Sequence, residues 1–200
     1  MGPGTSRRGR PAGRISNSYA GPVVEPAGGP LLYSVGHGTR PIEAFLDLLR
    51  RAGVRRLVDV RTAPGSRRNP QFDRDALRSS VEAAGIEYVW AGRELGGFRT
   101  PHPSSRHVAL RHVAFRGYAD HMDTDVFRGG LDWLLGAGVE APTAFVCAES
   151  DWHRCHRRMI SDAIVARGGR VIHLLDRGDE EHRLHPVARI AGGRPVYDVG

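Results

Sequence analysis

The sequence predicts an α/β fold with three layers, in which a mostly parallel sheet of about five strands lies between helices. Short apolar runs of strand length alternate with segments that repeat apolar residues at helical spacing, from residue 31 to residue 175. Strands joined through a helix pair in parallel by right-handed crossover connections. The length of 200 residues, with 40% hydrophobic residues, suits one domain with a sizeable core.

The first half of this pattern contains three strands and two helices. The expected elements are, in order, strand 31–35, helix 41–52, strand 56–60, helix 73–84 and strand 86–90. The first helix is amphipathic, with Phe45 and Leu49 on one face, and Gly53 ends it.

The second half begins with a long irregular segment and then returns to the alternation. The expected elements are irregular segment 91–115, helical sequence around 117–136, strand 143–147, helix 156–167 and strand 170–175. The last 25 residues, which include Gly192-Gly193 and Pro195, are expected to form a covering arm or a loose tail.

The two ends of the chain differ from the middle in composition. Residues 1–30 are rich in Gly, Pro, Ser and Arg and lack periodicity, so they are predicted to be a disordered basic leader. The α/β domain is assigned to residues 31–190, and residues 191–200 to a C-terminal tail.

Charge and hydropathy limit the partners and the compartment. The formal net charge is +7, and every basic residue except histidine is an arginine. No apolar run approaches the length of a membrane span, and no secretory signal follows the N-terminal arginines. We therefore expect a cytoplasmic protein without a membrane partner, in which the two cysteines are reduced, reactive or metal-bound.

The predicted topology also predicts where a ligand binds. In open parallel sheets, ligands bind at the carboxyl edge of the strands. The loops that leave this edge carry histidine, aspartate, arginine and cysteine, whereas the loops at the opposite edge are mostly glycine and alanine. This asymmetry places the candidate site at the carboxyl edge.

Both cysteines fall at this edge. Cys147 ends a strand, while Cys155 and His156 begin a helix, whose dipole and neighbouring arginines favour a thiolate. Three interpretations remain open. A cysteine is a nucleophile assisted by His156 or His37, or Cys147, Cys155 and His156 bind a metal, with His37 or His153 as a further ligand. In the third interpretation, Cys147 is a small buried core residue and His156 packs beside the helix.

Arginines gather on the loop after the second strand. Arg61, Arg67 and Arg68 would form a cationic mouth for phosphate or carboxylate. Asp59 ends the strand and either orients one of these cations or forms a structural ion pair with it.

The segment 91–115 has the length and the glycines of a lid over the site. Arg116 and Tyr118, which open the following helix, are candidates for ligand contact. The histidines at 102, 107 and 112 fit no regular metal-ligand spacing and are expected on the surface.

Six motifs follow one another along the chain: SVGHGTR at 34–40, LVDVR at 57–61, PGSRRNPQF at 64–72, ELGG at 94–97, FRGYAD at 115–120, and CAE at 147–149 with CHR at 155–157. Through these motifs the chain resembles, from residue 33 to about residue 186, the bacterial and archaeal family named domain of unknown function 488. Gly38 stands where we expect serine in most members.

The chain also resembles rhodanese and cysteine-phosphatase folds, in which one strand ends in Asp-x-Arg and a later strand delivers a cysteine. In those folds five residues separate the cysteine from the arginine, whereas six separate Cys147 from Arg154 and nine separate Cys147 from Arg157.

These features predict an enzyme, a hydrolase or transferase, that acts on a small anionic nucleotide, phosphorylated metabolite or sulfur-bearing metabolite. Cys147 or Cys155 would be the nucleophile or a metal ligand, and His37 or His156 the acid or base. The alternative is a non-catalytic nucleotide or nucleic-acid binding module that uses the arginine-lined edge. The residues expected to contact the substrate are Asp59, Arg61, Arg67, Arg68, Arg116, Tyr118, Glu149 and Arg157.

Overall fold

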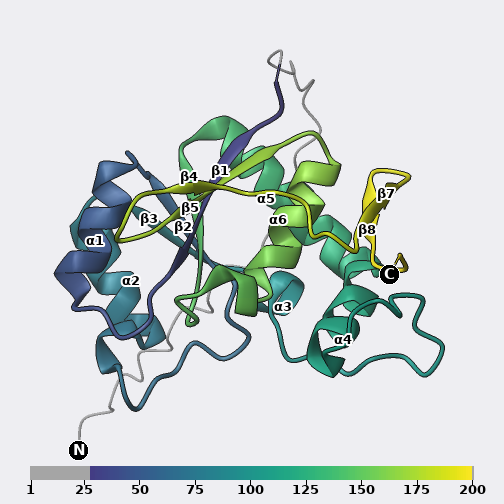
Figure 1. Ribbon diagram of the computed structural model, residues 1–200. Coiled ribbons are helices and arrows are strands. Elements are labelled where there is room, and N and C mark those ends of the chain that lie inside the picture. Colours follow the sequence, from purple (N-terminus) through teal and green to yellow (C-terminus); the bar gives the residue numbers. More distant parts are fainter. Residues whose placement is uncertain (1–27, 200) are drawn as a thin grey trace, which may run out of the picture.

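The central sheet has six strands in the order β3-β2-β4-β1-β5-β6, and only β6 runs antiparallel to its neighbour. The structure, a computed structural model, describes residues 28–199 (Figure 1). The strands are β1 (Leu31–Gly36), β2 (Arg56–Asp59), β3 (Glu87–Trp90), β4 (Thr143–Cys147), β5 (Arg170–Leu174) and β6 (Glu180–Glu181). The five parallel strands are those predicted from the apolar runs, and β6 is an addition.

Helices cover both faces of this sheet, so the predicted α/β fold with three layers is confirmed (Figure 1). Buried side chains of α1 and α2 pack on one face, and those of α4, α5 and α6 pack on the other. The helices are α1 (Ile42–Arg51), α2 (Arg74–Ala83), α3 (Gly92–Leu95), α4 (Val113–Met122), α5 (Asp125–Glu140) and α6 (Arg157–Ala166), and the 3-10 turns are η1 (Pro70–Phe72) and η2 (Trp152–Arg154).

The helical sequence expected around 117–136 forms two helices, α4 and α5. The hydroxyl of Thr124 accepts a hydrogen bond from the backbone N–H of Phe127 and caps α5. The segment 91–115 is also not wholly irregular, since it contains α3 and the first turn of α4.

The C-terminal residues form a covering arm, not a loose tail. After β6, the hairpin of β7 (Arg189–Ala191) and β8 (Arg194–Val196) packs beside α6 (Figure 1). Val196 and Tyr197 are buried, and the Tyr197 hydroxyl donates to Oδ2 of Asp162 on α6 at 2.8 Å. Residues 191–197, which were assigned to the C-terminal tail, belong to this arm.

The predicted basic leader lies outside the described residues up to residue 27. From residue 28 onward the chain leads directly into β1, and the carbonyl of Pro30 accepts from the backbone N–H of Arg170 at 2.9 Å. Among the helices of residues 28–199, none combines the length and the apolar character needed to cross a bilayer.

The substitution Tyr197→Phe tests how strongly the arm is held. It removes the hydroxyl that satisfies one oxygen of a fully buried carboxylate, so the free energy of unfolding should fall by about 1–3 kcal/mol. Denaturant unfolding of the full chain measures this change. Tyr33→Phe is the matched control, since no hydrogen bond joins the Tyr33 hydroxyl to another described residue, and an equal loss in both variants would contradict the anchoring role.

Candidate functional site

A cavity of about 720 Å³ opens at the carboxyl ends of β1, β2 and β4. Its position is the one that the sheet topology predicts. The cavity is lined by segments that follow these strands, by the 97–98 turn and by α4; its predicted site residues are His37, Arg61, Tyr118, Cys147, Glu149, Cys155 and His156.

The two cysteines meet because of strand alternation. Phe145 packs into the core on the α6 side of the sheet, and Cys147, two residues later, points to the same side. Cys155 and His156 begin α6 on that side, with His156 at the N-cap position. The sulfur of Cys147 lies 3.9 Å from Nδ1 of His156, and the sulfur of Cys155 lies 3.8 Å from the same nitrogen.

The orientation of His156 is determined by its second ring nitrogen. Nε2 lies 3.2 Å from the carbonyl oxygen of Val60, which can only accept, so Nε2 carries the proton of the neutral ring. The lone pair of Nδ1 is then directed between the two sulfurs. Gly97 packs against this ring, where a Cβ atom would lie 3.1 Å from Nδ1.

The two thiols influence each other's protonation. A hydrogen bond from Cys147 is the largest cause that lowers the pKa of Cys155 well below its usual value, and the nearby His156 and Arg157 act in the same direction against burial. The same bond to Cys155, together with burial, raises the pKa of Cys147 well above its usual value. The pair therefore loses its first proton readily and retains its second.

Arg157, which was expected to bind the substrate, does not line the cavity. Its guanidinium is buried and donates to the carbonyl of Glu149 at 2.5 Å and to Oγ of Ser34 at 3.1 Å. Residue 157 lies in the first turn of α6, and its bond to Ser34 directs the side chain toward β1. Its positive charge adds to the lowering of the pKa of Cys155 and opposes the rise in the pKa of Cys147.

Asp59 and Arg61 form a buried ion pair at the end of β2. Nε and Nη2 of Arg61 donate to the two carboxylate oxygens at 2.9 and 2.6 Å. Asp59 is fully buried and does not line the cavity, and the Tyr88 hydroxyl also donates to it. Of the two alternatives for Asp59, the structure shows the structural ion pair, and it largely neutralises Arg61.

His37 is held by the same cluster. Nδ1 donates to the carbonyl of Gly38 at 2.9 Å, and Nε2 lies 3.2 Å from Nη1 of Arg61 and accepts from it. The ring stacks on Phe72 at 4.2 Å. Burial is the largest cause that lowers the pKa of His37 to about 4, and Arg61 adds to it. Because the lone pair of Nε2 already accepts a hydrogen bond from Arg61, His37 is poorly placed to act as an acid or base.

The other predicted contacts divide into two groups. Glu149 and Tyr118 line the cavity, although the Tyr118 hydroxyl is already bonded to the carbonyl of Leu95 and burial raises its pKa well above the usual value. Arg67, Arg68 and Arg116 do not line it. Arg67 and Arg68 are exposed on the rim loop, and Arg116 donates to the carbonyl of Leu110. Contact of these three arginines with a substrate stays a prediction.

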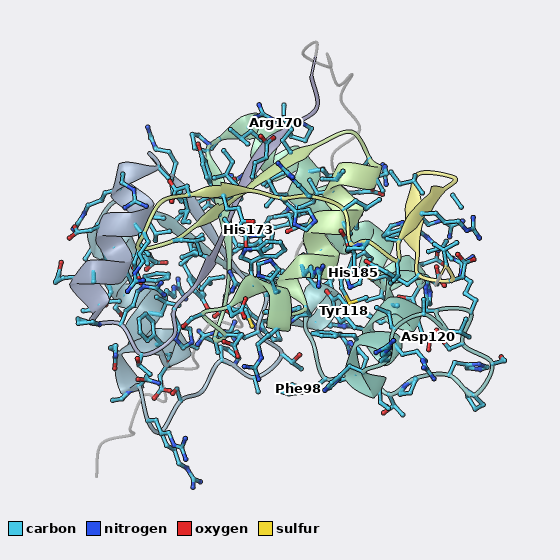
Figure 2. The ribbon with its side chains drawn as sticks, in the orientation of Figure 1. Phe98, Tyr118, Asp120, Arg170, His173 and His185 are labelled. Carbon is cyan, nitrogen blue, oxygen red and sulfur yellow. The ribbon has the colours of Figure 1, made fainter. Side chains whose placement is uncertain are left out.

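Sequence reasoning missed two aromatic residues and one cation in the cavity lining. Phe98, Phe115 and Arg154 all line it. Phe98 is 89% exposed and has a φ of +54°, which is unusual for a residue that is not glycine. Figure 2 shows it at the edge of the molecule. The signal available in the sequence was an aromatic residue directly after a Gly-Gly pair.

A buried chain of polar groups behind the cavity was also missed. Nε2 of His182 donates to Asp162 at 2.9 Å, so its Nδ1 accepts from Nε2 of His173 at 3.0 Å. His173, labelled in Figure 2, stacks on Trp152 at 3.9 Å, and its Nδ1 is buried without a partner in the described structure. Burial is the largest cause that lowers the pKa of His173 to about 2.

The surface position expected for His107 is also wrong. This side chain is buried and pairs with Asp123 at 3.1 Å, whereas His102 and His112 are exposed as expected. His107 therefore belongs to the packing between the long loop and α4.

Comparisons with known proteins give one match. The model of the family described as "Domain of unknown function DUF488" matches residues 41–164, a narrower range than the 33–186 over which the motifs resemble it. No curated protein and no solved structure matches the chain. The resemblance to rhodanese and cysteine-phosphatase folds therefore has no support from these comparisons.

Asp59→Asn tests the buried ion pair. The variant leaves the Arg61 guanidinium without a counter-ion in a buried site, so the free energy of unfolding should fall by about 3–5 kcal/mol. Asp47→Asn is the control, because Asp47 pairs with Arg50 on the surface and its loss should cost less than about 0.5 kcal/mol. Equal losses in urea unfolding would show that the Asp59–Arg61 pair is not the stabilising contact.

The pH dependence of stability tests the buried histidine chain. In the unfolded chain His173 gains a proton below about pH 6.5, but in the folded protein it resists protonation until about pH 2. Its contribution is therefore complete above pH 6.5 and falls by about 1.4 kcal/mol per pH unit below it.

His173→Gln preserves a donor toward His182 and removes this titration. Between pH 6.5 and 4, the unfolding free energy of the variant should fall less steeply as the pH is lowered than that of the wild type. The difference between the two slopes should correspond to about one proton. His37 titrates in the same direction in both proteins, so it cancels in the comparison. Parallel curves for the two proteins would contradict the assignment.

Proposed function

The chain belongs to the DUF488 family, and we propose that it is an enzyme which hydrolyses a small organic molecule or transfers a group from it. The reaction centre would consist of Cys147, Cys155 and His156. The single observation that carries this proposal is that two sulfur atoms and one imidazole nitrogen meet in the wall of a large cavity at the carboxyl edge of the sheet.

This arrangement can perform nucleophilic chemistry. Nδ1 of His156 faces both thiols and can accept a proton from either, which leaves a thiolate to attack an electrophilic centre of the substrate. The attack displaces a leaving group, which takes the proton back from His156. The bond from Nε2 to the carbonyl of Val60 keeps the ring in this orientation. Alternatively, the same three atoms can hold a metal ion that activates a water molecule. Both routes lead to hydrolysis or group transfer.

The cavity lining favours a substrate with a flat ring and an anionic group. A volume of about 720 Å³ is within the range of small-molecule sites. Phe98 and Phe115 offer aromatic faces, and Arg154 offers an exposed cation that forms no ion pair with another described residue. Among the anionic substrates that the sequence predicts, a nucleotide fits this combination best.

A second candidate is a non-catalytic module that binds a nucleotide or nucleic acid. Arg67 and Arg68 are exposed on the loop whose neighbours, Ser66 and Asn69, line the cavity. Cations on the rim of a cavity suit contacts to a phosphate backbone better than contacts to a buried small substrate.

Turnover of a substrate panel distinguishes these two functions. Nucleotides, other phosphorylated metabolites and sulfur-bearing metabolites are incubated with the full chain, and products are identified by mass spectrometry. We expect one class to be consumed. Replacing His156 by Ala should reduce turnover by about 10²–10⁴-fold, because proton transfer at the centre is lost, and Cys147→Ser and Cys155→Ser should also impair it.

The control is His153→Gln, an exposed histidine near the centre that does not line the cavity, which should retain turnover. Turnover that survives loss of both cysteines would contradict the proposed centre. Binding of single-stranded nucleic acid without turnover, with affinity that falls by about 0.7 log units per phosphate contact for each decade of salt, would favour the binding module.

A further inference from the structure

We infer that Cys147, Cys155 and His156 bind a thiophilic divalent metal ion of the zinc class, with its fourth coordination position open to the cavity. This inference deepens the proposed function and rests on it for the role of the metal. The binding itself rests on geometry. Within residues 28–199, these residues form a group whose ligand atoms all lie within 4.8 Å of one another.

The distances are close to those of a tetrahedral centre. Zinc binds sulfur at about 2.3 Å and imidazole nitrogen at about 2.0–2.1 Å, so neighbouring sulfur and nitrogen ligands lie roughly 3.6 Å apart. The observed distances from Nδ1 of His156 to the two sulfurs are 3.9 and 3.8 Å. The three ligand atoms, which all lie within 4.8 Å of one another, need to move closer together to reach the distances of a bound ion.

The protonation of His156 also fits a metal ligand. Metal-binding histidines donate their second ring nitrogen to a carbonyl or carboxylate, which determines the tautomer and the ring orientation. Here Nε2 donates to the carbonyl of Val60, at the end of the neighbouring strand, and the lone pair of Nδ1 remains free for the ion.

The ligands are placed by rigid parts of the fold. Cys147 is the last residue of β4, and its carbonyl accepts from the backbone N–H of His37 at 3.0 Å. His156 begins α6, and its ring is confined between Gly97 and Tyr118, whose ring centre lies 5.1 Å away. A preorganised ligand set costs little conformational entropy when the ion binds.

The donor set selects the ion and the type of site. Two thiolates and one imidazole suit zinc and disfavour magnesium or calcium, which prefer oxygen. Three protein ligands that all line a cavity leave one position for water or substrate, as in catalytic zinc sites, whereas structural sites use four protein ligands. Binding to the two thiols releases two protons, and the resulting thiolates neutralise the charge of the ion.

Cobalt(II) reports this coordination directly. The full-length chain is reduced, freed of metal with a chelator and titrated with cobalt(II) alone. We expect one ion per chain, the strong visible absorption of tetrahedral cobalt, and thiolate-to-cobalt charge-transfer bands. Zinc should displace cobalt and bleach both signals. In parallel, thiol labelling with Ellman's reagent should modify both cysteines in the metal-free protein and neither in the zinc-loaded protein.

Variants identify the ligands. Cys147→Ser and Cys155→Ser should each lose charge-transfer intensity, and His156→Ala should lose the tetrahedral spectrum, whereas His153→Gln should behave as the wild type. Circular dichroism confirms that each variant folds. If a cysteine variant does not fold, the wild-type charge-transfer bands and thiol protection still decide whether sulfur binds the ion.

Two results would overturn the inference. One is a reduced wild-type chain that takes up no cobalt, and the other is cobalt binding that is unchanged in the double variant Cys147→Ser with Cys155→Ser. The proposed function fails on different results. Turnover by a chain that binds no cobalt would support the function and reject the metal site. Cobalt binding without turnover of any substrate would support the metal site and reject the function.

Discussion

The buried guanidinium of Arg157 is the contact on which the geometry of the candidate site depends. It joins β1, through Ser34, to the carbonyls of Glu149 and Ser150 in the loop before α6. Gly36 makes this approach possible, since a Cβ there would lie 2.7 Å from Nη2 of Arg157 and closer still to the Glu149 carbonyl. These contacts hold the loop between the two cysteines against β1, and the loop brings Cys155 back beside Cys147.

The same guanidinium has an electrostatic consequence. Arg157 is 1% exposed and forms no ion pair with a carboxylate among the described residues. Burying an unneutralised cation is costly, so negative charge nearby is favoured. The pKa of Cys155 is lowered by the hydrogen bond from Cys147 and, in addition, by Arg157, which also opposes the rise in the pKa of Cys147. Arg61 differs, because Asp59 already neutralises it. The charge of Arg157 therefore favours the thiolate of Cys155.

Much of the fold and part of the site could be predicted from the sequence. Periodicity located the five parallel strands, and topology then placed His37, Arg61 and Cys147 at one edge. The division between α4 and α5 was predictable in principle, because Asp123-Thr124-Asp125 contains a good N-cap. Side-chain direction in the loops was not, since it depends on long-range contacts. Composition alone cannot show that Arg157 turns inward or that His107 is buried.

The loop between the two cysteines explains why this site differs from an anion cradle. In a cradle, successive backbone N–H groups face one bound anion. Here the carbonyls of Glu149 and Ser150 face inward and accept from Arg157. The loop therefore presents hydrogen-bond acceptors to the interior, where a cradle presents donors. The loop is also long enough to form η2, which leads the chain back so that the sulfur of Cys155 lies near the sulfur of Cys147. Seven residues between the cysteines therefore build a centre of two sulfurs and one nitrogen, and its ligand should be a cation or an electrophile, not a phosphate held by the loop itself.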